Sequence, residues 1–128
     1  MRRLIPALCA CLAALAGCGG DDEEPVRTAE LKADEPIRMT ADEYRFDPGA
    51  IKAASAARGV RITLVNRGEL AHNIRVLDGD RELGGVPSFP PGEERSTTVR
   101  LAPGTYRFVC TVSDHEELGM TGELVVGE

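Results

Sequence analysis

Apolar and polar residues alternate along several short segments of this chain, with the period of two that is typical of β-strands. The clearest example spans residues 60–66, where every second side chain is aliphatic: Val60, Ile62 and Leu64. The same pattern predicts further strands at 37–44, 72–77, 95–101, 105–110 and 122–126. Turn-forming stretches such as FDPG, DGD and APGT separate these segments, and no long helical period lies between them.

Strands this short, without alternating helices, favour an all-β fold in which two antiparallel sheets form a sandwich. With 128 residues the chain has room for at most one domain. Two segments are less regular. The alanine-rich residues 50–59 are expected to form a short helix or an irregular connection, and residues 84–94 a surface loop between strands.

The N-terminus has the pattern of an export signal, in which a basic start is followed by an apolar run too short to span a bilayer comfortably. The run ends in LAGC, and these residues, Leu15 to Cys18, resemble a bacterial lipobox. We therefore predict a lipoprotein signal peptide at 1–17 and a lipid on Cys18. The alternative is an ordinary secretory signal with a chance cysteine, and both interpretations place the protein outside the cytoplasm.

The residues after Cys18 are polar, charged and interrupted by proline, which is typical of a flexible tether. We expect an acidic tether at 18–36 and the folded domain at 37–128. Together these segments predict a protein that is lipid-anchored on the extracytoplasmic face of a membrane.

Charge and cysteine usage narrow the possible partners and chemistry. The net charge is −6, and loss of Arg2 and Arg3 with the signal would leave 13 basic residues against 21 acidic ones, a charge of −8. Nucleic acid is therefore not an expected partner, since its binders carry basic faces. Removal of Cys9 and Cys11 and lipidation of Cys18 would leave one thiol, Cys110. Exported proteins usually pair their cysteines, so an unpaired one is expected to be buried or bound to a ligand.

The segment CTVSDHEELGM places Cys110, His115 and Met120 five residues apart. This spacing fits neither one helical face nor a continuous strand, so the three side chains can converge only in a folded loop. The other histidine, His72, begins a predicted strand that can end at the same pole of a sandwich. Each residue alone is more typical of a protein core. Together, two imidazoles, a thiolate and a weak thioether form the ligand set of a type 1 copper site, whose chemistry is electron transfer. Zinc would gain little from the thioether.

The domain resembles a cupredoxin, the family of blue copper proteins. The resemblance is carried by F-x-P (46–48), N-x-G-x-x-x-H-N (66–73), Y-x-F-x-C (106–110) and G-M-x-G (119–122), and by the order of the four ligands. It implies a Greek-key sandwich and one type 1 copper per chain, with His72, Cys110, His115 and Met120 as ligands. It also implies that Asn73 links the two ligand-bearing loops and points its backbone N–H at the thiolate. Ser113 and Asp114 depart from the family, because many cupredoxins with a loop of this length have Pro-Gly here. We expect this change to alter the stiffness of the loop and the reduction potential.

The favoured function is a membrane-tethered carrier of single electrons between extracytoplasmic redox proteins. The alternative is a protein for copper delivery, storage or resistance without a redox partner, and a metal-free interaction module is a weaker third. A closed ligand set favours the carrier, and catalysis is not expected because no coordination position is open and no nucleophile–base pair is evident. The resemblance implies that the C-terminal histidine ligand reaches the surface and passes electrons. Asp114, Glu116 and Glu117 beside His115 would then either steer a basic partner or only keep the loop soluble.

Overall fold

The computed structural model describes residues 24–128, and within them the chain forms strands, turns and loops without a helix. The strands are β1 (Thr28–Leu31), β2 (Ile37–Asp42), β3 (Arg45–Asp47), β4 (Ala50–Ala53), β5 (Ala56–Asn66), β6 (His72–Asp78), β7 (Arg81–Phe89), β8 (Glu94–Leu101), β9 (Gly104–Val109) and β10 (Thr121–Val126). The predicted signal peptide at 1–17 and the lipid site at Cys18 lie outside the described residues. No helix in the described part of the chain is long and apolar enough to cross a membrane.

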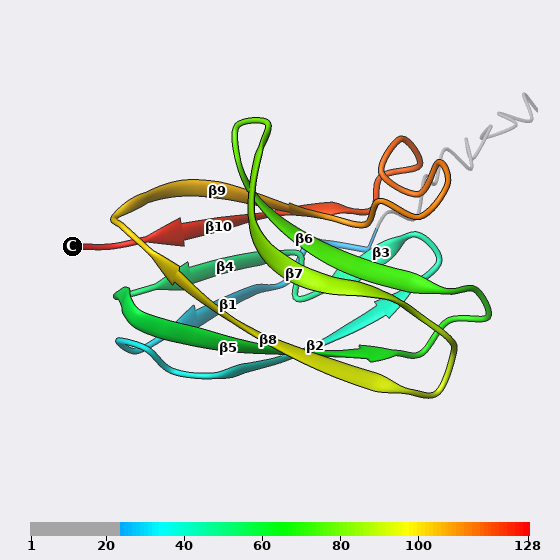
Figure 1. The fold of residues 1–128 in the computed structure, drawn as a ribbon, viewed down its shortest axis with the longest axis horizontal. Coiled ribbons are helices and arrows are strands. Elements are labelled where there is room, and N and C mark those ends of the chain that lie inside the picture. Colours follow the sequence, from blue (N-terminus) through cyan, green and yellow to red (C-terminus); the bar gives the residue numbers. More distant parts are fainter. Residues whose placement is uncertain (1–23) are drawn as a thin grey trace, which may run out of the picture.

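The strands form two sheets that face each other as a sandwich (Figure 1). One sheet has six strands in the order β1-β4-β10-β9-β6-β7, and the other has four in the order β3-β2-β5-β8. This arrangement confirms the predicted all-β, two-sheet fold.

The sheets are mixed, whereas the sequence predicted purely antiparallel pairing. β4 runs parallel to both β1 and β10, and β2 runs parallel to β5. Parallel neighbours need a long connection. Here the chain crosses to the other sheet in β4 before it returns as β5, and this crossing lets β2 and β5 run in the same direction.

Three expectations about individual segments were wrong. The segment 18–36, expected to be a tether, contains β1, because Ala29 and Leu31 pack against the core as the strand pairs with β4. The alanine-rich segment 50–59 forms β4 and the start of β5, where Ile51, Ala53 and Ala56 are buried. The segment 84–94 continues β7 as far as Phe89, whose side chain is buried.

The core between the sheets is aliphatic with a small aromatic centre. The rings of Phe46 and Phe108 meet edge to face, with 5.4 Å between their centroids. Gly122 in β10 lies against the ring of Phe108. A Cβ at this position would lie 2.5 Å from the carbonyl oxygen of Gly49 and closer still to the Phe108 ring. Only glycine allows β10 to approach the core this closely.

Three connections meet at one end of the sandwich: the β2–β3 turn, the β5–β6 loop and the long loop from β9 to β10 (Figure 1, right). They are far apart in the sequence, but the two sheets deliver them to the same pole. All the predicted metal ligands lie at this end.

Candidate metal centre

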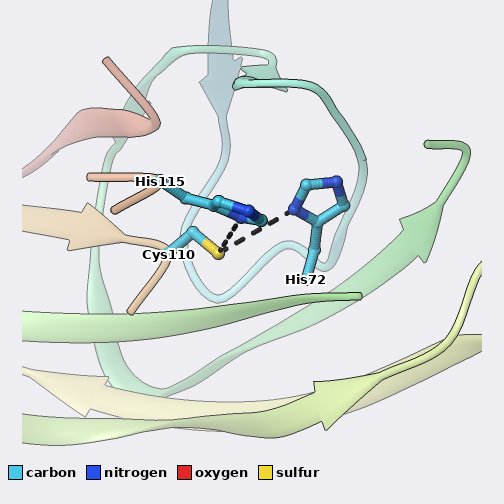
Figure 2. A group of neighbouring side chains, drawn as sticks. All are labelled: His72, Cys110 and His115. Carbon is cyan, nitrogen blue, oxygen red and sulfur yellow. Dashed lines mark hydrogen bonds between the residues drawn. The ribbon is translucent and has the colours of Figure 1, made fainter. Parts of the chain in front are cut away.

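Three predicted ligands converge at this pole, where Figure 2 shows two imidazole rings facing one sulfur atom. His72 is the first residue of β6, Cys110 directly follows β9, and His115 lies in the β9–β10 loop. The Cys110 Sγ atom is 3.9 Å from His72 Nδ1 and 3.5 Å from His115 Nδ1. One potential ligand atom from each residue lies within 4.8 Å of the others, and all three residues are buried.

The loop from Cys110 to Met120 folds back on itself, as its ligand spacing predicted. The His115 N–H donates to the Val112 carbonyl at 3.0 Å, and the Met120 N–H donates to the His115 carbonyl at 3.0 Å. The Cys110 N–H in turn donates to the Met120 carbonyl at 3.1 Å. These bonds bring Met120, whose side chain is fully buried, beside the other ligands.

Ser113 has a left-handed backbone conformation, with φ of 47°. This region favours glycine, so a residue with a side chain is strained there. Ser113 is also where the sequence departs from the Pro-Gly that many cupredoxins have before the second histidine. The departure therefore coincides with a left-handed residue of the ligand loop.

Asn73 connects the two ligand-bearing segments, as the resemblance implied. Its Nδ2 donates to Thr111 Oγ1 at 2.8 Å, and its Oδ1 accepts from the Thr111 N–H at 2.8 Å. The backbone N–H of Asn73 makes no hydrogen bond to the Cys110 sulfur among the contacts of the described residues, so that part of the implied role is not seen.

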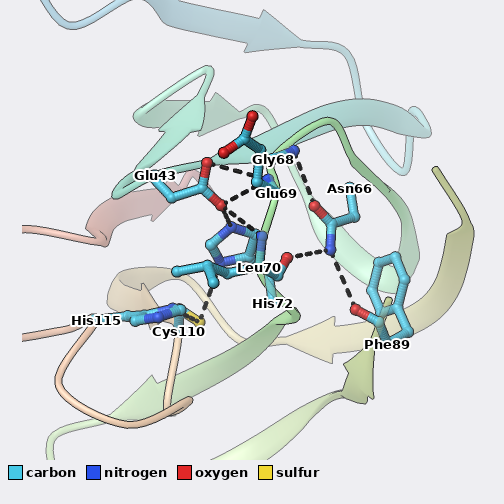
Figure 3. A network of polar contacts seen from close by, with 9 residues as sticks. All are labelled: Glu43, Asn66, Gly68, Glu69, Leu70, His72, Phe89, Cys110 and His115. Atoms are coloured by element: carbon cyan, nitrogen blue, oxygen red, sulfur yellow. Dashed lines mark hydrogen bonds and ion pairs between the residues drawn. The ribbon is translucent and has the colours of Figure 1, made fainter. Parts of the chain in front are cut away.

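Glu43, in the β2–β3 turn, was missed by the sequence analysis although it contacts a predicted ligand. Its Oε1 lies 2.9 Å from His72 Nε2, the ring nitrogen that faces away from Cys110 (Figure 3). The same carboxylate accepts the backbone N–H groups of Leu70 and Glu69. The N–H of Leu70, together with His72 and Glu69, holds the pKa of Glu43 below its ordinary value. No local pattern in the sequence marks this residue.

The expected exposure of His115 is not seen, because this residue is only 3% exposed. The ring of Tyr44 packs against it edge to face, with 5.0 Å between centroids. Of the three neighbouring acids, Glu116 forms an ion pair with Arg107, which reduces the charge it presents to solvent. Asp114 and Glu117 are exposed and form no ion pair among the described residues.

The donor set and its geometry fit a copper ion. Two ligands of one metal, a sulfur at about 2.3 Å and a nitrogen at about 2.0 Å, can lie at most about 4.3 Å apart. Both sulfur–nitrogen distances, 3.5 and 3.9 Å, are within this limit. Imidazoles suit copper and a thiolate selects Cu(I) over hard ions. The nearby carboxylate of Glu43 bonds the far nitrogen of His72 and is not one of the converging ligands.

Comparisons with known proteins agree with this site. A family model described as "Cupredoxin-like domain" matches residues 8–126. No curated protein matches the sequence.

Several solved structures share the fold. Reduced auracyanin from Roseiflexus castenholzii is 21% identical, with a TM-score of 0.68, and the match covers 75% of this chain and 99% of that one. Auracyanin A from Chloroflexus aurantiacus, described as a "blue" copper protein, is 24% identical, with a TM-score of 0.63 and coverage of 72% of this chain and 98% of that one. Rusticyanin from Thiobacillus ferrooxidans is 18% identical, with a TM-score of 0.63 and coverage of 77% and 81%.

Proposed function

Because the chain belongs to the family of cupredoxin-like domains, we propose that it is a blue copper protein that carries single electrons between redox proteins outside the cytoplasmic membrane. One observation carries the proposal: His72, Cys110 and His115 bring their ligand atoms within 4.8 Å of one another in a buried site, and the buried Met120 is joined to Cys110 by a backbone hydrogen bond. The site fits one type 1 copper ion.

The protein's part in electron transfer is to hold the ligands in a fixed, dry arrangement. His72, Cys110 and His115 would hold the metal and the Met120 thioether would be a weaker ligand, while the copper would supply the one-electron couple. The Asn73–Thr111 bonds and the backbone bonds of Met120 restrain the ligand loop. A rigid, buried ligand set needs little rearrangement when the charge of the site changes, and it leaves no open position for a substrate.

The surface around the ligand loops supports docking of a partner at this pole. Leu70 and Leu118 are 44% and 51% exposed, and they lie on the loops that precede His72 and follow His115. Exposed apolar side chains that gather into one patch mark interaction sites, and we propose that these two leucines belong to such a patch. Asp114 and Glu117 provide negative charge there, so the fitting partner has an apolar surface with a basic rim.

Copper retention distinguishes an electron carrier from a copper-delivery protein. The copper-loaded domain is cycled between oxidised and reduced forms in the presence of a competing Cu(I) chelator. A carrier keeps its copper over many cycles and shows a reversible one-electron wave in voltammetry. Transfer of the metal to the chelator at each reduction would instead support the delivery function.

The docking pole can be tested by charge reversal. Asp114→Lys with Glu117→Lys should slow reduction by a small cationic reagent and speed reduction by an anionic one, most clearly at low salt. Asp80→Lys with Glu128→Lys is the matched control, because these exposed acids lie in the β6–β7 turn and at the C-terminus, away from the ligand loops (Figure 1). Equal effects of the two pairs would show that electrons do not pass beside the ligand loop.

The lipid anchor is proposed from the sequence, where LAGC ends an export-type segment. In the producing cell, Cys18→Ser should release the protein from the membrane fraction, because the acyl chains supply the attachment and the acidic segment that follows cannot bind anionic lipid. Retention of this variant in the membrane at high salt would contradict the lipoprotein assignment.

A further inference from the structure

The imidazole of His72 is held from both sides. Its Nδ1 faces Cys110 Sγ at 3.9 Å, and its Nε2 lies 2.9 Å from Glu43 Oε1. An ionised carboxylate only accepts hydrogen bonds, so the proton must be on Nε2 and the lone pair of Nδ1 must point into the ligand cluster. Glu43 therefore selects the tautomer of His72 that can bind a metal.

The same carboxylate fixes the loop that leads into His72. Glu43 Oε1 accepts the N–H groups of Glu69 and Leu70, each at 2.9 Å (Figure 3). At the other side of the loop, Asn66 donates to the Leu70 carbonyl at 2.9 Å and accepts the Gly68 N–H at 3.0 Å. Four hydrogen bonds thus leave this loop little freedom.

Gly68 shows how closely these groups are packed. A Cβ at this position would lie 2.8 Å from His72 Nε2 and closer still to the Glu43 carboxylate. The loop backbone thus shields the contact between the acid and the ring. The Glu43 side chain is 27% exposed and the His72 side chain is fully buried, so the hydrogen bond is partly sheltered from water.

We propose that Glu43 is a positioning residue of the metal centre, which holds His72 with Nδ1 free to bind copper and whose negative charge stabilises Cu(II) relative to Cu(I). The inference rests on the proposed copper site. The higher charge of Cu(II) makes it the state that a nearby anion favours. Residues that hydrogen-bond to metal ligands commonly change metal affinity about 10–100-fold when they are altered.

The main test is Glu43→Gln, which removes the charge but keeps an oxygen that accepts from Leu70 and His72. The variant should still be blue, and its reduction potential should rise. We expect the preference for Cu(II) over Cu(I) to fall about tenfold, which corresponds to about 59 mV for one electron. Glu69→Gln is the matched control. It removes the charge of a nearby acid whose side chain makes no hydrogen bond to His72, so the reduction potential of this variant should stay near that of the wild type.

A second measurement tests the tautomer without copper. Long-range ¹H–¹⁵N spectra of the metal-free protein at about pH 8 should show the proton of neutral His72 on Nε2 in the wild type and in Glu43→Gln. In Glu43→Ala, which has lost the acceptor, both tautomers should be present. If Glu43→Ala does not fold, the wild-type and Glu43→Gln spectra still decide the assignment, and a proton on Nδ1 would overturn it.

Failure of this inference is distinguishable from failure of the proposed function. A wild-type protein that binds no Cu(II) would contradict the copper site itself. If the wild type is blue but Glu43→Gln leaves its reduction potential unchanged, the role of Glu43 is overturned and the copper site stands. The same conclusion follows if Glu69→Gln shifts the reduction potential as much as Glu43→Gln does.

Discussion

Replacement of Gly122 by alanine tests the packing that joins the core to the ligand loop. Gly122 is the second residue of β10 and lies two residues after Met120. The added Cβ would lie 2.5 Å from the Gly49 carbonyl oxygen and closer still to the ring of Phe108. Phe108 is fully buried and packs edge to face against Phe46. The backbone of β10 or the aromatic pair must therefore shift.

The size of the effect follows from these contacts. Overpacking a tight core by one methyl group typically costs about 1–3 kcal/mol. One of the two obstructing groups is a backbone carbonyl and the other is the buried ring of Phe108. We therefore expect a loss of stability in the upper part of that range, about 2–3 kcal/mol. For a domain of this size each kcal/mol lowers Tm by about 4–8 °C, so Tm should fall by roughly 10–20 °C.

The assay is chemical and thermal unfolding of the metal-free domain, since bound copper would add stability through mass action. Phe108→Leu is the companion variant, because a smaller side chain leaves room for the new methyl group. The double variant should be about 1 kcal/mol more stable than the sum of the two single effects predicts. A free energy of unfolding for Gly122→Ala within about 0.5 kcal/mol of the wild type would refute the described packing.

Two further predictions concern the thioether ligand and the stability at low pH. Met120→Leu should keep copper and colour but raise the reduction potential measured by voltammetry, because loss of the weak thioether donor disfavours Cu(II); a variant that cannot bind copper would contradict this. The Arg58 backbone N–H holds the pKa of Asp34 below its ordinary value. Its carboxylate therefore adds stability above its unfolded-state pKa, and this is lost as the pH falls below about 4. Asp34→Asn should flatten the stability curve in that range, and an unchanged curve would contradict the prediction.

The sequence predicts the strands and the convergence of the candidate ligands well, because each has a local signal. Strands such as β5 show alternation, as at Val60, Ile62 and Leu64, since one face is buried. The ligands are recognisable because few residue types bind copper, and only one cysteine and two histidines remain after the predicted tether. The fold then has only to bring these side chains to one pole.

The features that were missed depend on pairing between distant segments. β1 has only four residues, so its alternation is hidden among charged neighbours and is revealed only by its pairing with β4. Glu43 reaches His72 because β2 and β5 run parallel with Ala41 opposite Asn66, which places the acid beside the loop that follows β5. The local sequence around Glu43 gives no indication of this strand register. The prediction of purely antiparallel sheets was wrong for the same reason, because strand direction also depends on pairing between distant segments.

The central claim is that Cys110 is a ligand of a type 1 copper ion, and the visible absorption spectrum tests it most directly. Cys110 is the only cysteine in residues 19–128, so thiolate-to-copper charge transfer in the anchor-free domain can come from no other residue. The Cu(II) form is predicted to be intensely coloured, and Cys110→Ser is predicted to be colourless under the same conditions. A wild-type domain that stays colourless after incubation with Cu(II), or a Cys110→Ser variant that keeps the colour, would contradict the account.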